Sequence, residues 1–161
     1  MKKFLKIIVA FLALTLFLSG CSKEKSIIYN RHLYEDEDLY VILYYNNKNY
    51  VTELVVEYRM HGDERSLGEV EFVSKEIILK YFGPNNKDVV LKSEIKDNIV
   101  TVGCSVKVSD NTREGIKRML HTEVMFRGRK TNIFDDTKTN ILVDKVEKLC
   151  EEEHMTKIKE E

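Results

Sequence analysis

Two thiols in the interior of this 161-residue chain could do chemistry, those of Cys104 and Cys150. Outside the cytoplasm two such thiols can oxidise to a disulfide, and we expect both to point inward, one from a strand and one from a packing helix. The bond would close a loop of about 46 residues and stabilise the fold by roughly 4 kcal/mol. The alternative is a pair of reduced, buried side chains, the commonest behaviour of free cysteine. We favour the reduced pair, and the two alternatives stay open.

The third cysteine, Cys21, follows a hydrophobic leader. Three lysines stand near the start, and the apolar segment from Ile7 to Leu18 comes after them. That segment is shorter than the roughly 20 residues that a permanent membrane-spanning helix needs, and it is typical of a signal peptide. The alternatives are a lipoprotein signal and an ordinary secretory signal with an incidental cysteine.

The end of the leader favours the first alternative. Leu18-Ser19-Gly20-Cys21 resembles the lipobox of bacterial lipoproteins, an aliphatic residue and two small residues before a cysteine. In that family the cysteine sulfur receives a diacylglyceryl group, the chain is cut just before it, and a fatty acid such as palmitate is added to the new amino terminus. Two acyl chains give stable attachment where one is marginal. The resemblance implies lipidation of Cys21 and a lipid anchor on the cell membrane, facing outside the cytoplasm.

No other pattern favours catalysis or metal binding. Zinc needs converging imidazole, thiolate or carboxylate ligands, and the four histidines are scattered without helical pairing. Nucleophile elbows, phosphate-binding loops and dinucleotide fingerprints are absent. A calcium loop counted from Asp136 lacks its turn glycine. We therefore expect a protein that is not an enzyme, with no catalytic residue, metal or cofactor.

Six basic residues form a strip between positions 113 and 130. On an anchored domain it could rest on anionic headgroups or wall polymers, at around 1 kcal/mol per charge near the surface. The plainer interpretation, which we favour, is a solvated face balanced by an acidic C-terminal helix. The strip consists of Arg113, Lys117, Arg118, Arg127, Arg129 and Lys130.

Composition limits the class of protein. The chain has 26 basic and 27 acidic residues and is 43% hydrophobic, which is too apolar for intrinsic disorder. Its formal charge of −1 becomes −4 once the three lysines of residues 1–20 are removed. Nucleic-acid-binding domains are usually strongly basic, so we expect no nucleic-acid partner.

The elements that position these residues are two hairpins and three helices. Apolar runs at 39–45 and 50–60 flank an Asn-rich turn, and a second pair, 89–95 and 99–108, flanks Lys96-Asp97-Asn98. Spacings of three and four from Leu67 to Tyr81 predict an amphipathic helix that ends at Gly83-Pro84. We also expect helices over 110–120 and 137–153 and a short strand at 123–126.

The order of these elements, after the lipobox, resembles the YehR-like family of small bacterial lipoproteins. Tyr44-Tyr45-Asn46-Asn47-Lys48 at the first turn and Lys80-Tyr81-Phe82 at the helix end carry the resemblance, which covers most of the mature chain. It implies an α+β fold and no catalytic residues.

We therefore expect an α+β fold, antiparallel β-hairpins with amphipathic helices packed on one sheet face. The predicted domains are a signal peptide (1–20), a lipidated N-terminus and polar tether (21–38), one α+β domain (39–154) and a frayed tail (155–161). The expected function is a membrane-anchored, non-enzymatic accessory or binding module. The alternative is a small-ligand or ion-binding lipoprotein that serves a transporter, its protein or small-molecule partner being open.

Overall fold

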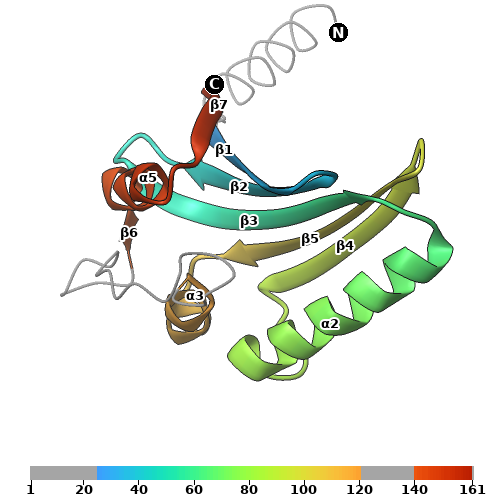
Figure 1. Ribbon diagram of the computed structural model, residues 1–161. Coiled ribbons are helices and arrows are strands. Elements are labelled where there is room, and N and C mark those ends of the chain that lie inside the picture. The colour runs from blue at the N-terminus through green and yellow to red at the C-terminus, as the bar shows by residue number, and fades with distance from the viewer. Residues whose placement is uncertain (1–24, 121–139, 161) are drawn as a thin grey trace, which may run out of the picture.

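An antiparallel sheet forms the centre of the protein (Figure 1). The computed structural model describes residues 25–120 and 140–160. In this part of the chain the seven strands follow the order β4-β5-β3-β2-β1-β7, and β6 pairs with β3. The strands are β1 (Lys25–Tyr34), β2 (Glu37–Tyr45), β3 (Tyr50–His61), β4 (Val89–Lys96), β5 (Ile99–Lys107), β6 (Ile141–Leu142) and β7 (Thr156–Glu160). With the helices α2 (Glu64–Phe82), α3 (Arg113–Leu120) and α5 (Val143–Glu152), the fold is α+β.

Both predicted hairpins are confirmed. Between β2 and β3 the side-chain oxygen of Asn46 accepts hydrogen bonds from the backbone N–H groups of Lys48 and Tyr50, at 2.9 and 3.2 Å. Between β4 and β5, Asp97 and Asn98 have φ angles of 54° and 61°. Two successive positive φ values are what the tightest hairpin turns require.

Side chains alternate across the sheet as the strand sequences predict. In β2 the buried residues are Leu39, Val41, Leu43 and Tyr45, which alternate with partly exposed neighbours. Strands β1, β2, β3 and β5 contribute their apolar side chains to one core cluster, and α3 and α5 contribute residues such as Ile116, Val146 and Leu149. A single core therefore joins the sheet to these two helices.

Two segments differ from the prediction. The polar tether was expected up to residue 38, but Lys25–Tyr34 forms β1, which pairs with β2 along its length. The frayed tail was expected from residue 155, but Thr156–Glu160 forms β7, which pairs antiparallel with β1. Ile27 and Tyr29 of β1 are only 1% exposed, so burial of alternate apolar residues outweighs the polarity of the segment.

The helices agree with the prediction more closely. Helix α2 ends at Phe82, and Gly83 caps it with a φ of 75°, as the Gly83-Pro84 signal predicts. Helix α3 begins at Arg113, and α5 begins at Val143, later than the predicted residue 137. The predicted strand at 123–126 lies outside the described residues. Among the helices that the structure describes, none has the length and apolarity to cross a bilayer.

Candidate functional site

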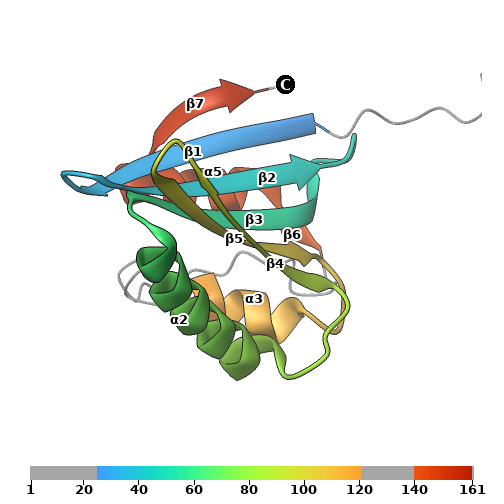
Figure 2. The same ribbon diagram turned by 90° about the vertical axis from the view of Figure 1, so that its right-hand side faces the viewer.

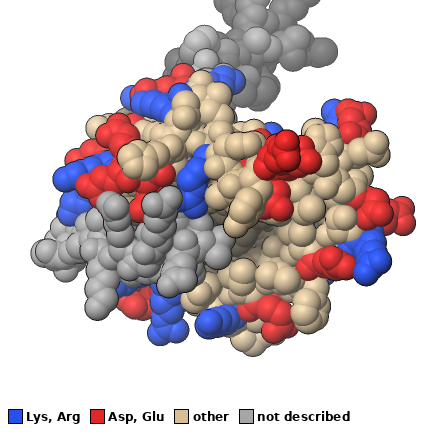
Figure 3. All heavy atoms as spheres, in the orientation of Figure 1, with Lys and Arg blue, Asp and Glu red and all other residues tan. Residues whose placement is uncertain are grey.

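The main candidate site is a cavity of about 520 Å³ between α2 and the sheet. Helix α2 lies beneath β4 and β5 in both ribbon views (Figures 1 and 2), and in this part of the molecule uncharged surface is bordered by charged side chains (Figure 3). The lining is apolar apart from Glu69 and Ser74. It consists of Leu39, Val56, Tyr58, Leu91, Val102 and Cys104 from the sheet, Val70, Val73, Ile77, Ile78 and Tyr81 from α2, and Met119 from α3.

Helix α2 does not pack closely against the sheet over its full length. None of its residues is buried, and Val73 and Ile77 remain 55% and 41% exposed although both line the cavity. An apolar helix stripe normally faces a packed core. Here the stripe faces an open space of a size that ligand pockets have in other proteins.

Close contacts fix both ends of α2. Just before its start, the Gly62 N–H donates to the Asn98 carbonyl oxygen of the β4–β5 turn at 2.9 Å, and a Cβ added to Gly62 would lie 3.1 Å from Val100 Cγ2 of β5. At its end, a Cβ added to Gly115 of α3 would lie only 2.3 Å from Cδ1 of Phe82. The helix is therefore held against the rest of the fold where a glycine permits close approach.

A third contact fixes the side of α2 next to β4. The Ser93 hydroxyl donates to Glu71 Oε1 at 2.5 Å, and this bond lowers the pKa of the Glu71 carboxyl. This bond joins α2 to the edge strand β4 beside the cavity.

The two cysteines occupy different environments. Cys104 lies in β5, is partly exposed and lines the cavity, whereas Cys150 lies in α5 and is buried in the core. Both are free thiols in the structure. Burial raises the pKa of each thiol to about 12, so neither is a thiolate at neutral pH.

The structure describes three residues of the predicted basic strip. Lys117 and Arg118 are exposed on α3, and Arg113 at its first turn is partly exposed. The apolar side chains of α3, Ile116, Met119 and Leu120, belong to the core. Arg127, Arg129 and Lys130, like Cys21, lie outside the described residues.

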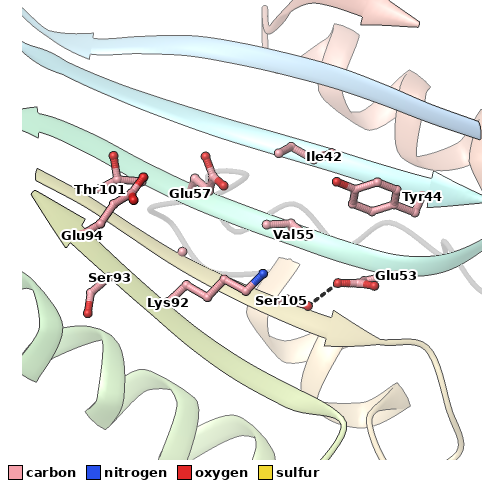
Figure 4. A pocket seen from close by; sticks show the side chains of 11 residues that line it. Ile42, Tyr44, Glu53, Val55, Glu57, Lys92, Ser93, Glu94, Thr101 and Ser105 are labelled. Atoms are coloured by element: carbon pink, nitrogen blue, oxygen red, sulfur yellow. Dashed lines mark hydrogen bonds between the residues drawn. The ribbon is translucent and has the colours of Figure 1, made fainter. Parts of the chain in front are cut away.

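A second, polar hollow of about 360 Å³ lies on the sheet face opposite the core (Figure 4). Gly103 is one of its lining residues. A Cβ at this position would approach Glu57 Cγ to 3.0 Å, so the glycine leaves room for the Glu57 side chain. Its lining consists of Ile42, Tyr44, Glu53, Val55, Glu57, Lys92, Ser93, Glu94, Thr101, Gly103 and Ser105.

The polar side chains of this hollow bond to neighbours. The Ser105 hydroxyl donates to Glu53, and Glu57 pairs with Arg59 at 2.6 Å. The Arg59 guanidinium in turn stacks over the Tyr40 ring at 4.1 Å. No imidazole lies among the described lining residues, and the partner of the Ser105 hydroxyl is the Glu53 carboxylate.

No metal centre forms in residues 25–120 and 140–160, because no three His, Cys, Asp or Glu side chains converge there. His32 contacts Asp38 at 3.1 Å, with both side chains solvent-accessible. This pair lies at the β1–β2 hairpin, away from both hollows.

Sequence reasoning treated the α2 stripe as packing and missed the cavity. One signal was present, since Phe72 and Leu79 make the opposite side of α2 apolar as well. They are 66% and 48% exposed. A helix that is apolar on two sides is usually buried, whereas α2 leaves both of these side chains exposed.

Comparison with known proteins gives one fold relative. No family model matches the sequence, and no curated protein matches it significantly. The NMR structure of the YehR protein of E. coli superposes with a TM-score of 0.58 at 14% identity, over 86% of this chain and 94% of that one. At this identity the likeness concerns the fold alone, and the chain is similar in fold to YehR.

Proposed function

We propose that this protein is a lipid-anchored, non-enzymatic binding module on the outer side of the cell membrane, and that the cavity beneath α2 is its binding site. The observation that carries the proposal is a helix that is fixed at both ends yet buries none of its residues. Preformed apolar cavities of several hundred Å³ are the usual sites for small ligands. In this proposal the helices α2, α3 and α5 cover one face of the sheet, and the polar hollow lies on the other face.

The position of β1 sets the distance to the membrane. Only three residues separate Cys21 from Lys25, where β1 begins. A fully extended step from residue 21 to residue 25 spans at most about 14 Å. An anchor at Cys21 would therefore hold the start of β1, with Lys25, directly at the headgroups.

The polar hollow favours a second candidate function. Its carboxylates, hydroxyls and the single Lys92 suit a small polar ligand better than an apolar one. A small-ligand lipoprotein that serves a transporter would use such a site.

The anchor is tested by labelling cells with a radioactive fatty acid. The wild-type chain is expected to carry the label and to fractionate with membranes, whereas Cys21→Ala is expected to lose both. A Cys104→Ala variant is the matched control, since it removes a thiol that the anchor does not use. Label retained by Cys21→Ala would contradict the proposal.

Binding is tested by measuring the midpoint of thermal unfolding of the purified mature chain in the presence of a panel of apolar ligands and a panel of polar ligands. A reproducible, saturable rise with apolar ligands supports the cavity, because a ligand that binds only the folded state stabilises it. A rise with polar ligands alone favours the second candidate. No rise with either class would contradict a binding function.

A further inference from the structure

The cavity is elongated along α2. Its lining on that helix runs from Glu69 to Tyr81, about 18 Å at 1.5 Å per residue. On the sheet side the lining comes from the four neighbouring strands β4, β5, β3 and β2. An apolar space of this length can hold an extended hydrocarbon chain.

The cavity offers almost nothing to a polar ligand. Glu69 pairs with Arg65 at 3.2 Å on the exposed side of the helix, so its charge is already engaged with a neighbour. Tyr58 turns its ring to the cavity while its hydroxyl bonds to Glu37; burial and that bond raise its pKa, so the group stays neutral. A charged or strongly polar group placed inside would lose its water without gaining partners.

The Cys104 thiol is also neutral in this setting. Its pKa is raised to about 12 by burial alone, and sulfur behaves as a soft, polarizable apolar group in such contacts. The part of a ligand that lies inside must therefore be uncharged and apolar, and any polar head must stay at the rim or in solvent.

We propose that the cavity beneath α2 binds the hydrocarbon part of an amphiphile, with the polar head outside. This inference rests on the proposed binding function and names its ligand class. The fixed ends of α2 make the space preformed, so the chain can enter without unfolding the helix. Both free fatty acids and the tails of membrane lipids have this chemistry, and the experiment must distinguish them.

The absence of tryptophan from the sequence provides the measurement. Tyr81→Trp places the chain's one indole in the cavity wall, and Tyr34→Trp, at a position 72% exposed on β1, is the control. The full lipidated chain is reconstituted in nanodiscs, and brominated fatty acid is titrated in. We expect saturable quenching of at least twofold for Tyr81→Trp and little for Tyr34→Trp. Tyr58→Trp is a second cavity variant should the first misfold.

Obstruction of the cavity gives a matched test. Ser74→Phe adds bulk to the cavity side of α2, and Leu79→Phe adds it to the exposed side. In the Tyr81→Trp background, Ser74→Phe is expected to abolish the quenching and Leu79→Phe to preserve it. Circular dichroism checks that each variant is folded.

A second titration shows whether the bound hydrocarbon chain comes from a free fatty acid or from a membrane lipid. Nanodiscs of brominated phospholipid without fatty acid will quench Tyr81→Trp if membrane tails enter the cavity, and will leave it unchanged if only free fatty acids bind. Absence of quenching in both arms, or equal quenching in the Ser74→Phe variant, would overturn the inference. The intact mass of the chain reports the anchor separately, so loss of the anchor is not confused with loss of binding.

Discussion

Gly115 is the residue on which the position of α2 depends most directly. A Cβ at this position would lie 2.3 Å from Phe82 Cδ1 and 2.8 Å from the Tyr81 carbonyl oxygen. The carbonyl is backbone and cannot rotate away as a flexible side chain can. From the sequence alone, Gly115 only weakens a predicted helix; the structure shows that its missing side chain permits the contact between α3 and α2.

We predict that Gly115→Ala lowers the free energy of unfolding by about 1–3 kcal/mol, because overpacking outweighs the gain in helix propensity. Urea denaturation of the mature chain measures it. Gly68→Ala is the matched control, since a Cβ there meets nothing within 4 Å, and we expect it to stabilise by about 0.5–1 kcal/mol. Destabilisation by both variants alike would contradict the contact.

At the same scale, the thiols give a prediction on reactivity. Because the thiolate is the nucleophile and burial raises the pKa of Cys104 and Cys150 to about 12, both should alkylate slowly at neutral pH. The rate for Cys104 should rise about tenfold per pH unit up to that pKa. Peptide mass spectrometry after iodoacetamide treatment measures each site, with the guanidinium-unfolded chain as the control. A disulfide-linked peptide seen without reductant would contradict the free thiols.

Among the elements, α2 depends on its caps to an unusual degree, since it buries none of its residues. Asp63 caps its first turn, and the hydrogen bonds from the Ser66 backbone and hydroxyl lower the pKa of the Asp63 carboxyl below its usual 3.8. A carboxyl whose pKa falls on folding stabilises the folded state above its unfolded pKa. That contribution disappears as the pH falls through the lowered value.

We therefore predict that Asp63→Ala lowers the urea midpoint at neutral pH and that this difference shrinks as the pH falls below about 4. Asp63→Asn is the control, because an amide also caps a helix but does not titrate; its midpoint should lose less on acidification than that of the wild type. Parallel acid dependence in wild type and Asp63→Asn would show that another group is responsible.

Local signals explain which elements could be predicted. The Asn46–Asn49 turn, the Asp97-Asn98 turn and the Gly83-Pro84 stop specify their structure within a few residues, and all three are confirmed. Strands β1 and β7, which the sequence analysis missed, have no such signal. Every residue of β7 is exposed, so its place depends on pairing with β1, more than 120 residues away in sequence. The cavity depends on how far α2 stands from the sheet, which periodicity cannot indicate.

For the whole molecule, strand direction separates two ends of the sheet. The start of β1 and the ends of β2 and β7 lie together (Figure 2), and we call this the anchor end. Exposed Lys25, Lys48, Lys87 and Lys107 lie there beside the acids Asp110, Asp144 and Glu160. The opposite end, with the β1–β2 and β4–β5 turns, carries exposed Glu35, Asp36, Asp63, Glu64 and Asp97 with the exposed cations Arg65 and Lys96, so its balance is acidic. For the anchor proposed at Cys21, an anionic membrane would repel that acidic end, so charge and chain length favour the same orientation.

This orientation gives a prediction for the anchored chain. Fluorophores attached through Asn47→Cys at the anchor end and Asp97→Cys at the acidic end should differ in distance from the headgroups by roughly 30 Å, the length of a nine-residue strand. Energy transfer to acceptor-labelled lipids in liposomes should be strong for Asn47→Cys and weak for Asp97→Cys.

The native thiols interfere little, because the high pKa of Cys104 and Cys150 keeps them protonated at neutral pH. Adding Cys21→Ala should abolish transfer from both sites. Equal transfer from the two labels in the lipidated chain would mean that the domain tumbles freely despite its short connection. The acidic end would then need another explanation, such as a protein partner that approaches from the side away from the lipid.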